Sequence, residues 1–159
     1  GVNAFAPAML DSGQPCVIAN MSSIAGISIA PIQASYVMSK HAVLAFSECL
    51  HLEMQMKSAN VQISAVLPGP VKTQIFECIE EQLDTVAAEH RQQMMALLDT
   101  NGMSAEAAAQ TILQQLSAGK FWVSTHPEMT QMMAEQRARH LSSLATPALD
   151  MESAFKADA

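Results

Sequence analysis

Hydrophobic and polar positions along the chain predict an alternation of helices and strands. Short runs of mainly apolar residues fit buried strands, because a strand in a parallel sheet is covered on both faces. The longer segments between them carry apolar residues at helical spacing. The predicted strands are 16–21, 61–67 and 121–124, and the predicted helices run to about 11, from 34 to 57, through much of 74–100, from 104 to about 118 and from about 126 to 144. The pattern therefore indicates an α/β protein.

Two features refine this picture. Asn101–Gly102 breaks the helical pattern, and Ser104 is placed to cap the helix that follows, with Glu106 in its first turn. The helix at 34–57 is apolar on more than one side, since the following residues spread around its circumference: Val37, Val43, Leu44, Phe46, Leu50, Leu52, Met54 and Met56. This helix therefore needs a second packing surface, which either another subunit or another part of the protein could supply.

The charge balance excludes one class of partner. Fifteen acidic and eight basic side chains give a net charge of -7. The sequence has no basic stripe and no aromatic stacking platform, so we expect no nucleic-acid partner. No apolar run is long enough to cross a bilayer, and the given N-terminus lacks the charged flank of a signal peptide, although an upstream N-terminus could still carry one. We therefore expect a cytoplasmic protein with no membrane partner.

Cysteine and histidine residues give no sign of a metal site. Cys16, Cys49 and Cys78 are odd in number, widely spaced and set among apolar residues, which favours reduced thiols. The five histidines show neither a His-Glu-x-x-His motif nor a Cys-His zinc spacing. We expect no metal.

Three residues carry the candidate chemistry. Tyr36 and Lys40 are four positions apart, so on a helix they share one face, where the ammonium favours the phenolate form of the tyrosine. Ser23 precedes Tyr36 by thirteen positions, and its hydroxyl can hold a carbonyl or alcohol oxygen. Tyr-x-x-x-Lys alone is a weak signal, because such pairs are common on solvated helix faces. Its significance depends on the neighbouring segments.

Those segments form an ordered set that resembles the short-chain dehydrogenases/reductases. A buried strand leads into Ser22–Ser23, the helix with Tyr36 and Lys40 follows, and the next strand ends in Pro68-Gly-Pro-Val-Lys-Thr73. The last segment is similar to the family's Pro-Gly-x-Val-x-Thr loop. Thr125-His-Pro-Glu128 is similar to a turn seen in some members, which extends the resemblance over most of residues 1–144.

The resemblance implies a fold, a cofactor and a set of site residues. The fold would be the C-terminal part of a doubly wound, parallel-sheet Rossmann-like domain with three α/β/α layers, here 1–144, followed by a loosely ordered tail at 145–159. The cofactor would be NAD or NADP. Ser23 would orient the substrate, Tyr36 would transfer the proton, and Lys40 would favour the phenolate form of Tyr36. The implied cofactor-binding residues are Tyr36, Lys40, Pro68, Gly69, Val71 and Thr73.

The family's other cofactor-binding elements are not found in this sequence. Its glycine-rich turn has no counterpart here, and Gly1–Leu10 resembles the middle of the helix that precedes the active-site strand. We therefore expect the chain to be the C-terminal portion of a larger protein, without the N-terminal nucleotide-binding half. In this alignment the family's catalytic asparagine would lie just before Gly1. Asn3 is not its counterpart, because the offset of Asn3 from the motif is wrong.

The family also implies a lid and an oligomer. Residues 74–102 correspond to its mobile substrate lid, in which Ile75, Phe76, Met94, Met95 and Leu98 are candidates for contact with an apolar substrate. Core packing is the alternative role for each of these five. The helix at 34–57 commonly packs against its copy in this family, which implies a homodimer or homotetramer.

Three interpretations of function remain open. The first is an oxidoreductase that transfers a hydride between NAD(P) and a carbonyl or secondary alcohol. The second is a truncated, inactive fragment that cannot bind the cofactor alone. The third is an oligomerising structural relic, against which the intact Ser23, Tyr36 and Lys40 argue. Substrate identity is not readable from the sequence.

Overall fold

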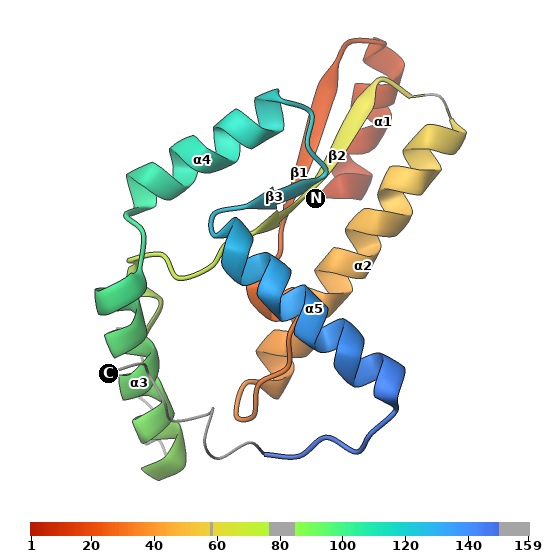
Figure 1. Ribbon diagram of the computed structural model, residues 1–159. Helices are drawn as coiled ribbons and strands as arrows, with labels where there is room; N and C mark the ends of the chain where they lie inside the picture. The colour runs from red at the N-terminus through yellow and green to blue at the C-terminus, as the bar shows by residue number, and fades with distance from the viewer. Residues whose placement is uncertain (58, 77–84, 150–159) are drawn as a thin grey trace.

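A parallel sheet with helices on both faces forms the centre of the molecule. The computed structural model describes residues 1–57, 59–76 and 85–149. In this part of the chain, β1 (Cys16–Met21), β2 (Val61–Leu67) and β3 (Trp122–Ser124) are parallel and lie in the order β1-β2-β3 (Figure 1). The helices are α1 (Val2–Ser12), α2 (Ala34–Met56), α3 (Thr85–Asn101), α4 (Ala105–Ser117) and α5 (Pro127–Ser143), with short 3-10 turns η1 (Ile24–Gly26) and η2 (Gln74–Phe76). The predicted α/β class is confirmed.

Successive side chains of β2 lie on opposite faces of the sheet. Ile63, Ala65 and Leu67 are 1%, 0% and 1% exposed and belong to the apolar clusters on the α2 side. On the other face, Gln62 donates from Nε2 to the carbonyl of Leu116 in α4 (3.1 Å). The mainly apolar run at 61–67 thus reflects a strand that is covered on both sides.

Helix α2 packs on the sheet along one side. Leu44, Leu50 and Met54 are buried against β2, whereas Phe46 and Met56 are 48% and 86% exposed. Helix α1 covers the same face of the sheet, through Val2, Met9 and Leu10. The apolar residues of α2 therefore include a set that the described part of the chain leaves uncovered.

Element boundaries agree closely with the sequence patterns. The strands at 16–21 and 61–67 match, and β3 begins one residue later than predicted. Ser104 caps α4, because its Oγ accepts from the main-chain N–H of Ala107 (3.1 Å). The helical stretch at 74–100 contains η2 and most of α3, while 77–84 lie outside the described residues. The predicted tail is without helix or strand at 145–149, and 150–159 lie outside the described residues.

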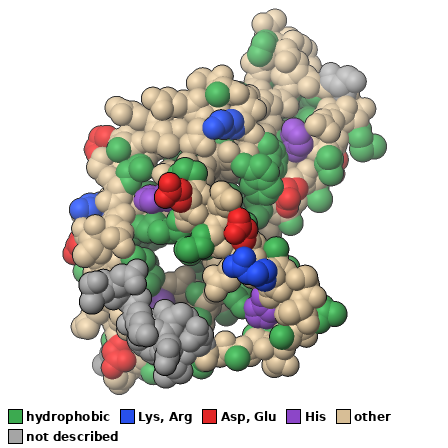
Figure 2. All heavy atoms as spheres, in the orientation of Figure 1, with side chains coloured by type: hydrophobic (Ala, Val, Ile, Leu, Met, Phe, Trp, Pro, Cys, Tyr) green, Lys and Arg blue, Asp and Glu red, His purple; other side chains and the backbone are tan. Residues whose placement is uncertain are grey.

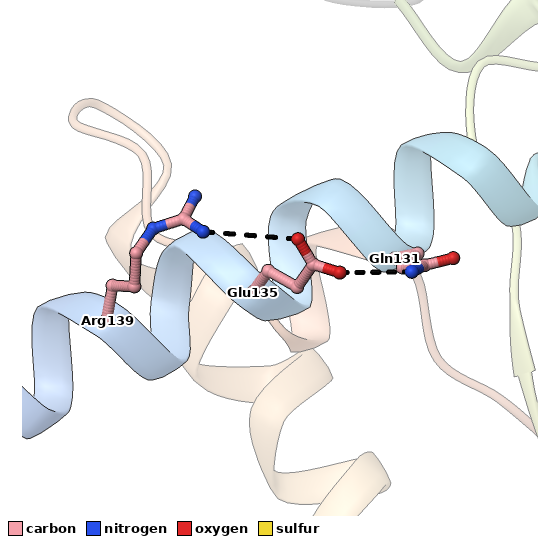
Figure 3. A network of polar contacts seen from close by, with 3 residues as sticks. All are labelled: Gln131, Glu135 and Arg139. Atoms are coloured by element: carbon pink, nitrogen blue, oxygen red, sulfur yellow. Dashed lines mark hydrogen bonds and ion pairs between the residues drawn. The ribbon is translucent and has the colours of Figure 1, made fainter.

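The visible surface carries both charged and hydrophobic side chains. Figure 2 shows charged side chains distributed over one face, some of opposite sign next to each other, with hydrophobic side chains gathered between them. Along α5, Glu135 accepts from Gln131 (3.0 Å) and lies 3.9 Å from the Arg139 guanidinium (Figure 3). Such exposed pairs stabilise a helix by only about 0.3–0.5 kcal/mol. Within the described residues, no helix is long and apolar enough to span a bilayer.

Candidate active site

The candidate site lies where the three strands end. In the register of the sheet, Met21 is level with Val66, and Leu67 is level with Ser124. The loops that begin at Ser22, Pro68 and Thr125 therefore leave the same edge of the sheet. Carboxyl edges of parallel sheets are the usual ligand-binding edges of open α/β folds.

The loop after β1 is fixed at both ends of its serine pair. The main-chain N–H of Ser22 donates to the Val66 carbonyl (2.9 Å), and that of Ile24 donates to the Pro68 carbonyl (3.1 Å). Ser23 is 9% exposed, and its Oγ accepts from the main-chain N–H of Ala25 (3.1 Å). Since a hydroxyl also carries one hydrogen, Ser23 keeps a donor for a further partner.

The same loop is joined to α2 at Lys40. Ser22 donates from Oγ to the Lys40 carbonyl (2.8 Å), and the Lys40 ammonium donates to the Met21 carbonyl (3.3 Å). Gly26 allows this approach, because a Cβ there would lie 2.9 Å from the Lys40 carbonyl oxygen. Ser22, which the sequence left without a definite role, thus ties the loop to the helix.

Tyr36 and Lys40 lie together on α2. The Lys40 Nζ is 5.5 Å from the centroid of the Tyr36 ring, within the range of a cation–π contact. The Tyr36 side chain is 37% exposed, and we find no hydrogen-bond partner for its hydroxyl among the residues that the structure describes. The ring thus contacts the ammonium, and its hydroxyl has no intramolecular partner in this part of the chain.

The Pro-Gly loop after β2 is held by two distant segments. The N–H of Gly69 donates to Thr125 Oγ1 (2.9 Å). Further along, Lys72 N–H donates to the Met103 carbonyl (2.9 Å), and Met103 N–H donates to the Pro70 carbonyl (3.0 Å), so that Val71 and Met103 form a parallel bridge.

Thr73 follows the part of this loop that forms the bridge at Val71. It is exposed and lines an open cavity of about 240 Å³ between the loop and α3. Three of the five apolar lid candidates, Phe76, Met95 and Leu98, line the same cavity. Ile75 is 60% exposed, and Met94 is half-buried. Thr73 therefore lines the same cavity as three of the lid candidates.

Two long-range contacts were not predicted from the sequence. Gln33, just before α2, lies 2.7 Å from His90 of α3 through their Nε2 atoms. Thr125 and His126, noted in the sequence only as part of a similar turn, contact Gly69. Neither contact has a local signal, because the partners are more than fifty positions apart. Among the described residues, no three His, Cys, Asp or Glu side chains could hold a metal together.

Comparisons with known proteins identify the family of the chain. The family model described as "short chain dehydrogenase" matches residues 1–84. A curated relative, the CLA biosynthesis dehydrogenase/reductase of Lactiplantibacillus plantarum, is 24% identical over 144 residues, which are 84% of this chain and 50% of the relative.

Solved structures show the same fold. A short chain dehydrogenase/reductase from Burkholderia phymatum, in complex with NAD, superposes with a TM-score of 0.85 at 24% identity, covering 95% of this chain and 57% of the other. A short chain dehydrogenase from Burkholderia cenocepacia, in complex with NADP, has a TM-score of 0.63 at 24% identity, with 91% and 54% covered. The chain thus spans about half the length of the relatives that it matches.

Proposed function

The chain belongs to the short-chain dehydrogenase family, and we propose that it carries the acid/base residues of an NAD(P)-dependent oxidoreductase acting on a secondary alcohol or its carbonyl. The observation that carries this proposal is the Tyr36–Lys40 pair, joined to the loop of Ser23 at the carboxyl edge of the sheet. The similar structures with NAD and with NADP support both dinucleotides equally.

The residues at this edge fit a nicotinamide dinucleotide. Lys40 has three ammonium hydrogens, one of which contacts the Met21 carbonyl at the long distance of 3.3 Å, so others are available to ribose hydroxyls. The main chain of the Pro-Gly loop lies beside the serine loop, through the bond from Ile24 to Pro68. The residues that would hold the cofactor are Tyr36, Lys40, Pro68, Gly69, Val71 and Thr73.

In this proposal each side chain has one task. The bound dinucleotide supplies the hydride acceptor or donor. Ser23 donates its free hydrogen to the substrate oxygen and so orients the reacting carbon. Tyr36 accepts the hydroxyl proton when the alcohol is oxidised and returns a proton to the carbonyl oxygen when the ketone is reduced. Lys40 stabilises the negative phenolate oxygen.

The lining of the cavity beside Thr73 supports the proposal that the substrate has an apolar portion. Phe76, Met95 and Leu98 contribute its apolar lining, while Lys72 and Asp99 lie at its polar part. We propose that the lid region at 74–102 contacts an apolar portion of the substrate through these residues. Methionine suits such a surface because its unbranched side chain adapts to irregular shapes.

The uncovered side of α2 supports self-association. Met38, Phe46, Leu52 and Met56 are 70%, 48%, 58% and 86% exposed on this helix. We propose that α2 packs against its copy in a homodimer or homotetramer. Phe46→Glu should then lower the molecular mass measured by light scattering, and an unchanged mass would contradict the contact.

The activity is tested in the protein expressed from its complete reading frame. Secondary alcohols and ketones with apolar chains are offered with NAD(H) and NADP(H), and turnover is followed by the absorbance of the reduced nicotinamide. Ser23→Ala should lower kcat by about 10²- to 10³-fold, because one hydrogen-bond donor to the substrate oxygen in the transition state is lost. Ser28→Ala is the matched control, because Ser28 lies in the same loop but donates to the Ile24 carbonyl (3.2 Å). Equal activity of the two variants would contradict the role of Ser23.

A further inference from the structure

Thr125 and His126 contact the Pro-Gly loop from the end of β3. Thr125 is 3% exposed, and its Oγ1 accepts from the N–H of Gly69 (2.9 Å). The same oxygen lies 2.8 Å from Nδ1 of His126. A single buried hydroxyl therefore connects the main chain of the loop to an imidazole ring.

The Thr125 hydroxyl can make both of these bonds at once. Its Oγ1 accepts from the Gly69 N–H with one lone pair, which leaves a second lone pair and one hydrogen for Nδ1 of His126. Which of the two atoms donates in the bond between Oγ1 and Nδ1 depends on the tautomer of the ring. Gly69, Thr125 and His126 thus form one chain of donors and acceptors.

The imidazole also fills the space above Gly69. A Cβ on Gly69 would lie 2.6 Å from Nδ1 and 2.8 Å from Cγ of His126, distances that real Cβ atoms essentially never show. The glycine is therefore required here by the close approach of His126. The loop is thus held by the hydrogen bond from Gly69 to Thr125 and by the close approach of His126.

Thr125 and His126 are themselves fixed by α4 and α5. Gln115 of α4 binds both main-chain groups of Ser124, accepting from its N–H (3.2 Å) and donating to its carbonyl (2.7 Å). Ser124 Oγ accepts from the His126 N–H (3.1 Å) and lies 2.7 Å from Thr130 Oγ1. The pair therefore approaches the Pro-Gly loop from a rigid base.

We propose that Thr125 and His126 are positioning residues for dinucleotide binding, acting through the main chain of Pro68–Gly69. This inference rests on the proposed function, in which that loop holds the nicotinamide dinucleotide. A loop that is already fixed binds its ligand without the cost of ordering it. Loss of the Thr125 hydroxyl should therefore weaken dinucleotide binding and leave the acid/base residues in place.

The first experiment needs no cofactor. Pro68 and Pro70 have no amide hydrogen, so Gly69 provides the one exchangeable main-chain amide within 68–70, and its hydrogen exchange can be measured in the complete protein. Thr125→Val should speed exchange at Gly69 by about tenfold, the equivalent of one net hydrogen bond of about 1.4 kcal/mol. Thr125→Ser, which keeps the hydroxyl, should restore protection. A Gly69 amide that exchanges equally fast in all three proteins would overturn the proposal.

The second experiment separates positioning from general stability. Thr130→Val is the matched control. This substitution also removes one hydrogen bond of the network, the one between Thr130 and Ser124 Oγ, but that bond does not involve the Pro-Gly loop. We expect Thr125→Val to raise the KM for the dinucleotide about tenfold and Thr130→Val to leave it within about twofold, at a similar loss of Tm. Equal KM values in the two variants would refute the positioning role. If the parent protein uses neither dinucleotide, the proposed function fails, while the exchange data still test the contact.

Discussion

A single methyl group added at Gly26 should disturb the candidate site. A Cβ at this buried glycine would lie 2.5 Å from Ser22 Oγ and 2.9 Å from the Lys40 carbonyl oxygen. The Ser22 hydroxyl can rotate away, but the Lys40 carbonyl belongs to the main chain of α2. Gly26→Ala must therefore push the serine loop away from the helix that carries Tyr36 and Lys40.

The size of the effect follows from two contributions. Overpacking in a well-packed interior costs about 1–3 kcal/mol. Separation of the loop from α2 also breaks the 2.8 Å bond from Ser22 to the Lys40 carbonyl, which is worth about 0.5–1.5 kcal/mol. Because Gly26 is not among the residues with positive φ, backbone conformation adds nothing. We expect a total loss of about 1.5–4.5 kcal/mol in the free energy of unfolding.

Chemical denaturation of the complete protein measures this loss, and the Ser22→Ala background tests its cause. Ser22→Ala removes the Oγ that the new methyl group would meet, so Gly26→Ala should cost less in that background than in the parent protein. A loss below about 0.5 kcal/mol, the range of ordinary surface substitutions, would refute the reasoning. Equal losses in the two backgrounds would show that the contact with Ser22 has no part in it.

Two further predictions, each a comparison of two variants, concern the stability of the fold alone. Ser104→Ala should cost about 1 kcal/mol, because it removes the side-chain cap of α4; Arg139→Ala, which breaks an exposed ion pair, should change the free energy of unfolding by less than about 0.5 kcal/mol. Denaturant midpoints would contradict this ranking if the two variants were equal. Ile63→Ala should cost about 2–5 kcal/mol because Ile63 is 1% exposed, and Leu113→Ala, at a 64% exposed position, should stay within about 0.5 kcal/mol in the same assay. A large loss at Leu113 would mean that another surface covers it.

Local sequence patterns predicted the helices and strands, but they did not predict the long-range contacts. β1 and β2 were predicted correctly because each is a run of mainly apolar residues. Tyr36 and Lys40 could be paired in advance because four positions make one helical turn. The bond from Gly69 to Thr125 joins residues 56 positions apart, and it depends on the register of β2 with β3. No periodicity in the sequence specifies that register.

The central claim is that Tyr36 exchanges the substrate proton. The most direct measurement is kcat of Tyr36→Phe in the complete protein, beside the Kd for the dinucleotide, with the substrate that the parent protein turns over best. We expect a loss of about 10²- to 10⁴-fold in kcat, since the phenol is the general acid/base in this proposal, while the dinucleotide still binds. A Tyr36→Phe protein that keeps the parent kcat would contradict it.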